Sequence, residues 1–394
     1  MKRFVYADNA ATTPVSREVI EAMLPCFENE WGNPSSMHEK GRDAKDILDD
    51  ARERVAAALG ASAKEIYFTS SGTEADNWAI KGAYSRLCKK GKNEIVTSII
   101  EHPAVLNTCK ALEKMGAKVT YVGVDADGVV NLDELRAAVN EKTAIVAVMY
   151  ANNEIGTIEP IEEICEIAHK AGALVFTDAV QAVGNIAIDL SKLPVDMLSL
   201  SGHKIHAPKG IGALFIRRGV VIDNLIDGGG QEMRKRSGTE NLPYIVGLAK
   251  ALEMANEQLN DMTRVAKMRD RLISELEKIP YSKLNGHRTK RLPGNVNIGF
   301  EFIEGESMLL WLDIAGIAAS TGSACSSASL EPSHVLIACG VPHEKAHGSL
   351  RLSISHDTTD EDIDYIIENV PAIVEKLRNM SPLWEEVVKS ECAK

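Results

Sequence analysis

Lys204 lies directly after an apolar run, a position where a lysine can do covalent chemistry. The run Asp196–Ser201 leads into Gly202-His203-Lys204, and the glycine-rich turn Pro208–Gly212 follows. Partial burial lowers the pKa of a lysine, and the neutral amine can then form a Schiff base with a carbonyl group. Most lysines that follow a strand are solvated, so this segment alone leaves both interpretations open.

A second segment supplies an acid for the same chemistry. Asp178 ends the apolar run Ala173–Asp178, 26 residues before Lys204, and Gln181 follows three residues later. Pyridoxal phosphate needs an acidic partner that keeps its ring nitrogen protonated, because the protonated ring accepts electrons from the substrate. We therefore expect Asp178 and Gln181 to contact such a ring. The alternative for Asp178 is an ordinary cap on the next helix.

A third segment is typical of phosphate binding. In Ser70-Ser71-Gly72-Thr73-Glu74-Ala75, Gly72 permits a tight turn and Thr73 adds a hydroxyl group. The amides of the helix that follows would offer hydrogen-bond donors and a positive dipole end to a phosphate. Ser71 and Glu74 also match an ordinary capping box, and both interpretations can hold together.

Cys325 is the most unusual cysteine of the chain. It lies in Thr321–Ser329, among serines, alanines and a glycine that are typical of a mobile loop. A free cysteine is usually a small buried apolar residue, whereas an exposed thiol is prone to oxidation unless it is used. The loop 320–333 therefore predicts a reactive thiol, with an incidental surface cysteine as the alternative.

One motif points to a different chemistry. His343-Glu-Lys-Ala-His347 matches H-E-x-x-H, a zinc-protease pattern. Pro342 and Gly348 leave room for barely two helical turns before the apolar run Ser349–Ile354. We therefore expect an exposed or capping histidine pair and no metal site, with a zinc hydrolase as the remote alternative.

These residues need a framework that brings them together. Short apolar runs at 65–69, 94–99, 118–122, 143–150, 173–178 and 196–199 alternate with helical patterns at 44–59, 132–139 and 161–171. Such alternation predicts an α/β fold with a mainly parallel sheet covered by helices. Ligands of such sheets bind beyond the carboxyl ends of the strands.

The remaining sequence predicts a second, smaller α+β domain. The segment 243–279 is a long helix or a kinked pair, and strands at 295–300 and 349–354 and a helix from Thr359 follow it. We expect a large domain at 16–257, and a small domain formed by 1–15 with 258–394 that carries the cysteine loop.

Composition narrows the functional classes. The 394 residues carry a net charge of −12, which argues against direct DNA binding. No apolar run approaches the length of a membrane span, and we expect no signal peptide. The seven cysteines include no CxxC pair, so a reducing, cytoplasmic location is expected.

Together these segments resemble the pyridoxal-phosphate-dependent cysteine desulfurases of the class V aminotransferase family, in the branch with a long cysteine loop. The resemblance rests on ten ordered segments: YADNAATTP, GNPSSMH, FTSSGTEADN, EHPAV, ANNEIG, TDAVQAVG, SLSGHKIHAPKGIG, GGGQEMRKRSGTEN, TGSACSSAS and HGSLRLS. It implies the aminotransferase-like fold type I.

The resemblance also implies residue roles. Lys204 would bind the cofactor covalently, Asp178 would pair with its ring nitrogen, Gln181 would contact the ring hydroxyl and His102 would stack on the ring and transfer protons. The phosphate would be held by Gly72, Thr73, Ser201, His203 and, from the neighbouring subunit of a homodimer, Thr239. Asn153 and Arg351 would hold the substrate, the arginine by a bidentate grip on its carboxylate.

The implied function is the conversion of L-cysteine to L-alanine, with a persulfide left on Cys325. A base must help to ionise that thiol, and His102 is the candidate. The expected sulfur acceptor is an iron–sulfur scaffold protein, with tRNA thiolation as a further destination. The alternatives are a selenocysteine lyase or another pyridoxal phosphate enzyme acting on an amino acid, and a non-catalytic sulfur carrier.

Overall fold

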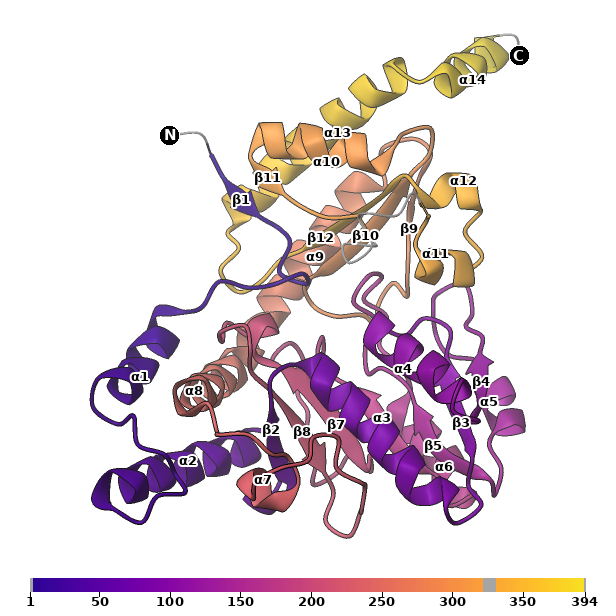
Figure 1. The fold of residues 1–394 in the computed structure, drawn as a ribbon. Helices are drawn as coiled ribbons and strands as arrows, with labels where there is room; N and C mark the ends of the chain where they lie inside the picture. The colour runs from indigo at the N-terminus through magenta and orange to yellow at the C-terminus, as the bar shows by residue number, and fades with distance from the viewer. Residues whose placement is uncertain (1–2, 322–330, 393–394) are drawn as a thin grey trace.

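A seven-stranded sheet forms the centre of the larger part of the molecule (Figure 1). The computed structural model describes residues 3–321 and 331–392. The sheet has the strand order β2-β8-β7-β6-β5-β3-β4, and only β8 runs antiparallel to its neighbours. Its strands are β2 (Ile66–Thr69), β3 (Glu94–Ser98), β4 (Lys118–Val122), β5 (Thr143–Ala147), β6 (Leu174–Asp178), β7 (Met197–Ser201) and β8 (Gly212–Ile216).

Helices cover both faces of this sheet. Successive side chains of a strand point to opposite faces, so Val146 packs in one core while Ile145 and Ala147 pack in the other. The first core includes α1, α2, α5, α6 and α8, and the second includes α3 and α4. The helices are α1 (Arg17–Glu28), α2 (Glu39–Ala58), α3 (Gly72–Cys88), α4 (Pro103–Glu113), α5 (Leu132–Ala138), α6 (Ile161–Lys170), α7 (Gln231–Arg234) and α8 (Leu242–Gln258).

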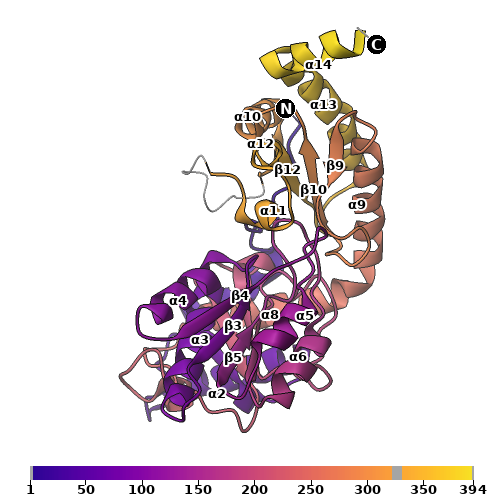
Figure 2. The same ribbon diagram turned by 90° about the vertical axis from the view of Figure 1, so that its right-hand side faces the viewer.

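A three-stranded antiparallel sheet, in the order β12-β10-β9, lies in the second part of the molecule (Figures 1 and 2). A separate core of apolar side chains joins it to its helices. The strands are β9 (Ser282–Leu284), β10 (Asn295–Phe300), β11 (Ile317–Ala318) and β12 (Ser349–Ser353). The helices are α9 (Met262–Leu276), α10 (Gly305–Ala315), α11 (His334–Ala338), α12 (His343–Ala346), α13 (Asp360–Asn379) and α14 (Pro382–Cys392).

Two connections join the parts. A 3₁₀ turn at Leu259–Asp261 lies between α8 and α9, so the segment 243–279 is the kinked pair among the two predicted forms. The N-terminal strand β1 (Val5–Tyr6) pairs with β11, and Val5 and Ala7 belong to the core of the second part. This arrangement agrees with the expected division at 1–15, 16–257 and 258–394, which stays a prediction.

The α/β class with a mainly parallel sheet is confirmed. The antiparallel strand β8 was not predicted. The first residue of β8 is a glycine, which allows the strand to start close to β7 and to the N-terminus of α3. A Cβ at Gly212 would lie 2.7 Å from the carbonyl oxygen of Leu200 and 2.8 Å from the carbonyl carbon of Ser71. None of the described helices is both long and apolar enough to cross a membrane.

Candidate active site

A cavity of about 440 Å³ opens at the carboxyl ends of β2, β3, β5, β6 and β7. Parallel strands end at the same edge of a sheet, so loops far apart in the sequence meet there. Of the predicted site residues, the cavity is lined by Gly72, Thr73, His102, Asn153, Asp178, Gln181, Ser201, His203, Lys204 and Arg351. The sequence analysis therefore identified most of the polar lining.

Lys204 ends the short 3₁₀ helix Gly202–Lys204 that follows β7. Its Nζ donates hydrogen bonds to the carbonyl oxygens of Ala10 and Ala11, at 2.6 and 2.7 Å. Both acceptors belong to the N-terminal segment that follows β1. These two hydrogen bonds hold the amine at the cavity wall and fix its direction.

Asp178 forms part of a buried pair of carboxyl groups. One of its oxygens accepts a hydrogen bond from the Val180 amide at 2.9 Å, while Asp76 accepts one from the Ser199 hydroxyl at 2.6 Å. Carboxylate oxygens of both acids and a ring nitrogen of His102 lie within 4.8 Å of one another. Burial raises the pKa of Asp178, and burial and the charge of Asp178 raise the pKa of Asp76 well above its usual range.

This pair is suited to a cationic ring nitrogen. Two adjacent buried carboxyl groups resist carrying two negative charges, because desolvation and mutual repulsion both favour the protonated form. A pyridinium nitrogen placed against Asp178 would stabilise a single carboxylate there, with Asp76 remaining protonated beside it. The carboxyl pair thus fits the ring nitrogen of pyridoxal phosphate.

His102 caps the N-terminus of α4. Its Nδ1 accepts a hydrogen bond from the Ala104 amide at 3.1 Å, and a neutral ring that accepts at Nδ1 carries its proton on Nε2. In this orientation the neutral imidazole donates a hydrogen bond from Nε2 and cannot accept a proton there. Gln181, which also lines the cavity, donates from Nε2 to the Ala10 oxygen at 3.0 Å.

The predicted phosphate loop forms the start of α3. A Cβ at Gly72 would lie 2.7 Å from Cγ2 of Val180 and 3.4 Å from Cβ of Ser201, so only glycine allows this close approach. Ser71 caps the helix by accepting a bond from the Glu74 amide, whereas the Glu74 carboxylate accepts from the amide and hydroxyl of Ser70, so only half of the predicted capping box forms. Thr73, Ser201 and His203 line the same cavity, and hydroxyl groups beside a helix N-terminus suit a phosphate.

His203 lies beside this predicted phosphate loop and is held neutral. Burial, with the charges of Lys204 and Lys209, lowers the pKa of His203 to about 4. Its Nδ1 lies 3.2 Å from the Thr12 hydroxyl oxygen. A neutral imidazole contributes a hydrogen bond to a phosphate rather than a charge.

Arg351 supplies the cation expected for a substrate carboxylate. Its side chain is 2% exposed and donates to the Asn153 carbonyl oxygen at 3.1 Å and to Asp8 at 3.0 Å. Its Nε is buried and has no hydrogen-bond partner among the described residues. An unpaired buried donor costs free energy, and a carboxylate in the cavity would satisfy it.

The sequence analysis missed several polar residues at this site. Asp76, Glu154 and His334 also line the cavity, and buried Glu101 lies beside them. Burial raises the pKa of Glu154 to about 7, and the hydroxyl of Ser333 donates to its carboxylate. His334 Nε2 lies 3.1 Å from the Glu101 carbonyl oxygen. The one available signal was position, since Glu101 and Glu154 directly flank the predicted residues His102 and Asn153.

Of the two remaining predicted residues, the structure describes only Thr239. Cys325 and most of the predicted loop 320–333 fall outside the described residues. Thr239 is exposed and is not among the described residues that line the cavity. A buried ion pair between Arg52 and Glu232, with N–O distances of 2.7 and 2.8 Å, anchors the segment that carries Thr239 to β2.

The H-E-x-x-H segment forms only the four-residue helix α12. The rings of His343 and His347 lie with centroids 5.0 Å apart, and the side chain of His343 is 65% exposed. Neither histidine belongs to a group of three potential metal ligands among the described residues.

Comparisons with known proteins show the family of this chain. The aminotransferase class V family model matches residues 5–366. A cysteine desulfurase IscS from Methanosarcina thermophila is 58% identical over 96% of this chain and 94% of its own length. An IscS from Clostridium botulinum is 52% identical over 99% of both chains.

Solved structures extend the comparison to the fold. A NifS-like protein has a TM-score of 0.90 and 42% identity, covering 95% of this chain and all of its own. The protein chain therefore belongs to the class V aminotransferases and, within them, to the cysteine desulfurases, which are pyridoxal phosphate enzymes.

Proposed function

We propose that this protein converts L-cysteine to L-alanine and transfers the sulfur atom to Cys325. The overall reaction is L-cysteine plus the Cys325 thiol giving L-alanine plus the Cys325 persulfide, which balances in atoms and electrons. The observation that carries the proposal is the meeting, in one cavity, of Lys204, Asp178, the Gly72 turn and Arg351 with its buried Nε. In that order, these residues would attach the cofactor covalently, pair with its ring nitrogen, bind its phosphate and bind the substrate carboxylate.

Pyridoxal phosphate, when bound, supplies the electron-withdrawing ring that weakens the bonds to be broken in the substrate. The chain would hold it with Lys204, Asp178, Gln181 and the phosphate cradle of Gly72, Thr73, Ser201 and His203. Lys204 Nζ is also our candidate for removing the α-proton of the substrate. Its carbonyl partners, Ala10 and Ala11, can accept hydrogen bonds from the protonated amine afterwards.

The sulfur transfer needs a thiolate at Cys325, whose Sγ attacks the substrate sulfur while the carbon–sulfur bond breaks. In its present orientation the neutral His102 ring donates a hydrogen bond from Nε2, and its lone pair on Nδ1 is directed at the Ala104 amide. A role of His102 as the base for the thiol therefore requires the ring to leave its contact with Ala104. We expect His102 to stack on the cofactor, and it can return a proton to the product carbon only after the ring has gained one and become an imidazolium.

We infer the substrate class from Arg351 and Asn153. A guanidinium group with one buried donor that has no partner in the described part of the chain favours a carboxylate. A solved relative that is 36% identical was determined in complex with cysteine, and its TM-score of 0.79 covers 89% of this chain and 98% of its own. L-cysteine is therefore the proposed substrate, and L-selenocysteine is the alternative.

The fate of the sulfur follows from the relatives. We propose that the persulfide passes to an iron–sulfur scaffold protein in the cytoplasm, and that tRNA thiolation is a second destination. Support comes from the similarity to IscS proteins over nearly the whole chain. Mixing the persulfidated enzyme with a purified scaffold, and measuring the label transferred from ³⁵S-cysteine, tests this step.

We also propose a homodimer in which Thr239 serves the phosphate of the partner's cavity. Thr239 is exposed on its own chain, and α1 with the segment after it exposes a group of large apolar side chains. These are Ile20, Leu24, Phe27, Trp31 and Met37. Light scattering should give twice the chain mass, and Thr239→Val should weaken cofactor binding without dissociating the dimer.

The function is tested by assaying alanine and sulfide together after adding L-cysteine and a thiol reductant to the holoenzyme. Equal amounts of both products, lost in Cys325→Ala, support the proposal. Full turnover in Cys325→Ala would favour another reaction of the same cofactor, and sulfide release that survives Lys204→Ala would favour a sulfur carrier. A preference for selenocysteine that persists in Cys325→Ala would identify a selenocysteine lyase.

A further inference from the structure

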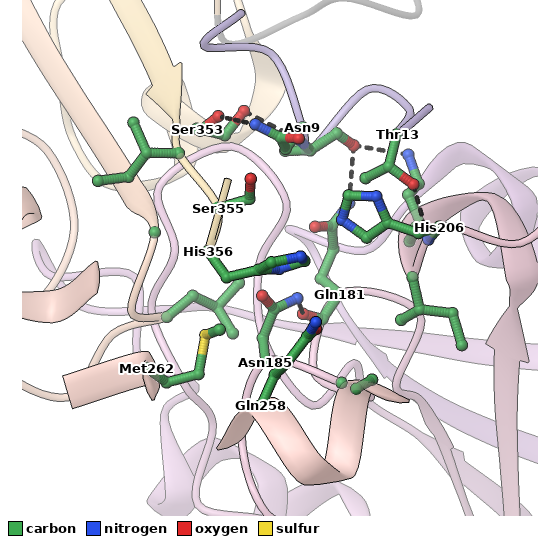
Figure 3. Close-up of a pocket in the computed structure, with 18 of the residues that line it drawn as sticks. Asn9, Thr13, Gln181, Asn185, His206, Gln258, Met262, Ser353, Ser355 and His356 are labelled. Carbon is green, nitrogen blue, oxygen red and sulfur yellow. Dashed lines mark hydrogen bonds between the residues drawn. The ribbon is translucent and has the colours of Figure 1, made fainter. Parts of the chain in front are cut away.

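A second, smaller cavity lies on the other side of Lys204. It encloses about 70 Å³ and is lined by residues of both parts of the molecule, among them Gln181, Lys204, His206, Met262 and His356 (Figure 3). Two histidines meet there, with ring centroids 4.9 Å apart and ring planes at 62°. Neither histidine is used by the proposed mechanism.

His206 is held in an unusual backbone conformation. Its φ of +64° lies in the left-handed region, which is uncommon for a residue other than glycine. The backbone is fixed there by a bond from its amide to the Thr13 hydroxyl oxygen at 2.8 Å and by one from the Ser16 amide to its carbonyl oxygen at 3.1 Å. A strained conformation persists only where surrounding contacts determine it, and such positions cluster at functional sites.

The ring of His206 is also fixed. Its Nδ1 lies 3.1 Å from the carbonyl oxygen of Pro14, which can only accept, so Nδ1 carries the proton and Nε2 keeps its lone pair. Metal-binding histidines commonly have this arrangement, in which one nitrogen donates to a carbonyl group and the other binds the metal.

His356 and Asp357 approach from the turn after β12. His356 Nε2 lies 3.2 Å from a carboxylate oxygen of Asp357. Two ligands of one tetrahedral zinc ion lie roughly 3.4 Å apart, given zinc–ligand bonds of about 2.0–2.2 Å. One ligand atom from each of His206, His356 and Asp357 lies within 4.8 Å of the others, so only small side-chain shifts are needed to close around an ion.

We propose that His206, His356 and Asp357 form a binding site for a divalent transition metal ion of the zinc type, in the crevice between the Lys204 turn and the strand of Arg351. Two imidazoles and one carboxylate suit Zn²⁺ or Co²⁺ better than Mg²⁺ or Ca²⁺, which prefer oxygen ligands. Three protein ligands leave the remaining position to water.

The neighbouring charges allow this site. Arg264 contacts the His356 turn, and its guanidinium group pairs with Asp261 at 2.9 Å and donates to the carbonyl oxygens of His356 and Thr358 at 2.6 and 3.0 Å. These bonds hold the turn in place, and they direct the positive charge of Arg264 toward oxygen atoms. The exposed carboxylate of Asp357 adds the negative charge that two neutral imidazoles lack.

The position of the site gives the metal a structural effect. His206 follows Lys204 by two residues, and His356 follows Arg351 by five. An ion shared by these histidines would link the lysine turn to β12, the strand that contains the substrate-binding arginine. Because a ligand that binds only the folded state stabilises it, binding should raise the unfolding temperature.

The test measures zinc in the holoenzyme with Cys325→Ser as the background, so that the loop thiol cannot bind the metal. The protein is equilibrated with Zn²⁺, desalted and analysed for zinc content. We expect about one bound ion per chain that is lost in His356→Asn and in His206→Asn, and an affinity at least tenfold lower in Asp357→Asn. Co²⁺ in place of Zn²⁺ should give the visible absorption of a low-symmetry site.

The pair His343 and His347 provides the matched control, because its rings are 5.0 Å apart on a short exposed helix. Zinc content that is unchanged in His356→Asn, or that is lost in the double variant His343→Asn/His347→Asn instead, would overturn the proposal. So would a wild-type protein that retains no zinc. Asp357 is exposed, so its replacement tests the site even if His206→Asn fails to fold.

A thermal unfolding measurement tests whether the bound ion also stabilises the fold by linking the two parts of the molecule. Excess Zn²⁺ should raise the unfolding midpoint of the background protein by a few degrees, roughly the effect of a ligand at a hundred times its dissociation constant. His356→Asn should remove that rise. A rise of equal size in His356→Asn would place the stabilising ion elsewhere and contradict the inference.

Discussion

The two cavities that border Lys204 differ in how the chain builds them. The larger cavity, of about 440 Å³, collects side chains from the carboxyl ends of parallel strands, and it holds buried acids and cations together. The smaller, of about 70 Å³, lies where turns of the two parts meet. A parallel sheet therefore places reactive groups by its topology, whereas the junction depends on a few backbone contacts such as those of His206.

The strongest test of this comparison is Lys204→Ala, since Lys204 lines both cavities. Loss of an essential covalent and proton-transfer group should lower kcat by about 10³-fold or more. Alanine formation and the visible cofactor spectrum measure the effect. Lys209→Ala, an exposed lysine of the same turn, is the control and should keep most of the activity. Equal losses in both variants would contradict the assignment.

Arg351→Lys should affect only the larger cavity. Lysine keeps the charge but loses the fork of donors, including the buried Nε, so the KM for L-cysteine should rise by about 100-fold. The cofactor spectrum before substrate is added should stay unchanged. A fall in kcat with an unchanged KM would show that Arg351 does not hold the substrate.

A pair of glycine variants separates the cavities further. Gly72→Ala places a Cβ 2.7 Å from Cγ2 of Val180 at the phosphate cradle, and cofactor affinity should fall about tenfold. Gly184→Ala, with φ at +79° and a Cβ 2.6 Å from Ile205, should instead lower the free energy of unfolding by about 1–3 kcal/mol. Cofactor titration and urea unfolding measure the two effects. An equal loss of cofactor affinity in both variants would contradict the expectation that only the larger cavity binds the cofactor.

The smallest expected effect concerns the pH dependence of stability. Burial raises the pKa of Glu154 to about 7, so the folded state binds this proton more tightly than the unfolded chain does. The stabilising contribution is complete below about pH 4.5 and is lost as the pH rises through 7. Glu154→Gln should therefore reduce the fall in unfolding free energy between pH 5 and 8 by on the order of 1 kcal/mol.

Urea unfolding at several pH values measures this slope, and Glu163→Gln, a change at an exposed position of α6, is its control. Slopes that are identical in wild type and Glu154→Gln would mean that Glu154 binds its proton equally in both states.

The larger cavity could be predicted from sequence to the extent that its residues end apolar strands. Asp178 and Lys204 follow buried runs, and Gly72 follows another, so local pattern located all three. Asp76 was missed because it lies inside α3, a helix that is buried on most sides. Such a helix has no clear division into a polar and an apolar face, so the sequence pattern does not show that Asp76 is a buried acid. Its role depends on Ser199, a residue 123 positions away, which no local pattern reveals.

The smaller cavity could not be predicted in the same way. His206 and His356 are 150 residues apart and follow no shared motif. Their meeting depends on the path of the N-terminal segment, whose Thr13 and Pro14 fix His206. The strand β8 escaped prediction for a related reason, because its direction is set by the short connection from β7 rather than by its own composition.

The pairing of β1 with β11 has a consequence for the synthesis of the chain. Val5 pairs with Ile317, and the Asn9 amide donates to the Ser353 carbonyl oxygen, so the first ten residues find these partners only after more than 300 further residues have been made. Lys204 in turn depends on Ala10 and Ala11 for its hydrogen bonds. The large sheet can form while the chain is still on the ribosome, but Lys204 reaches its final position only after residues 317–353 have been made.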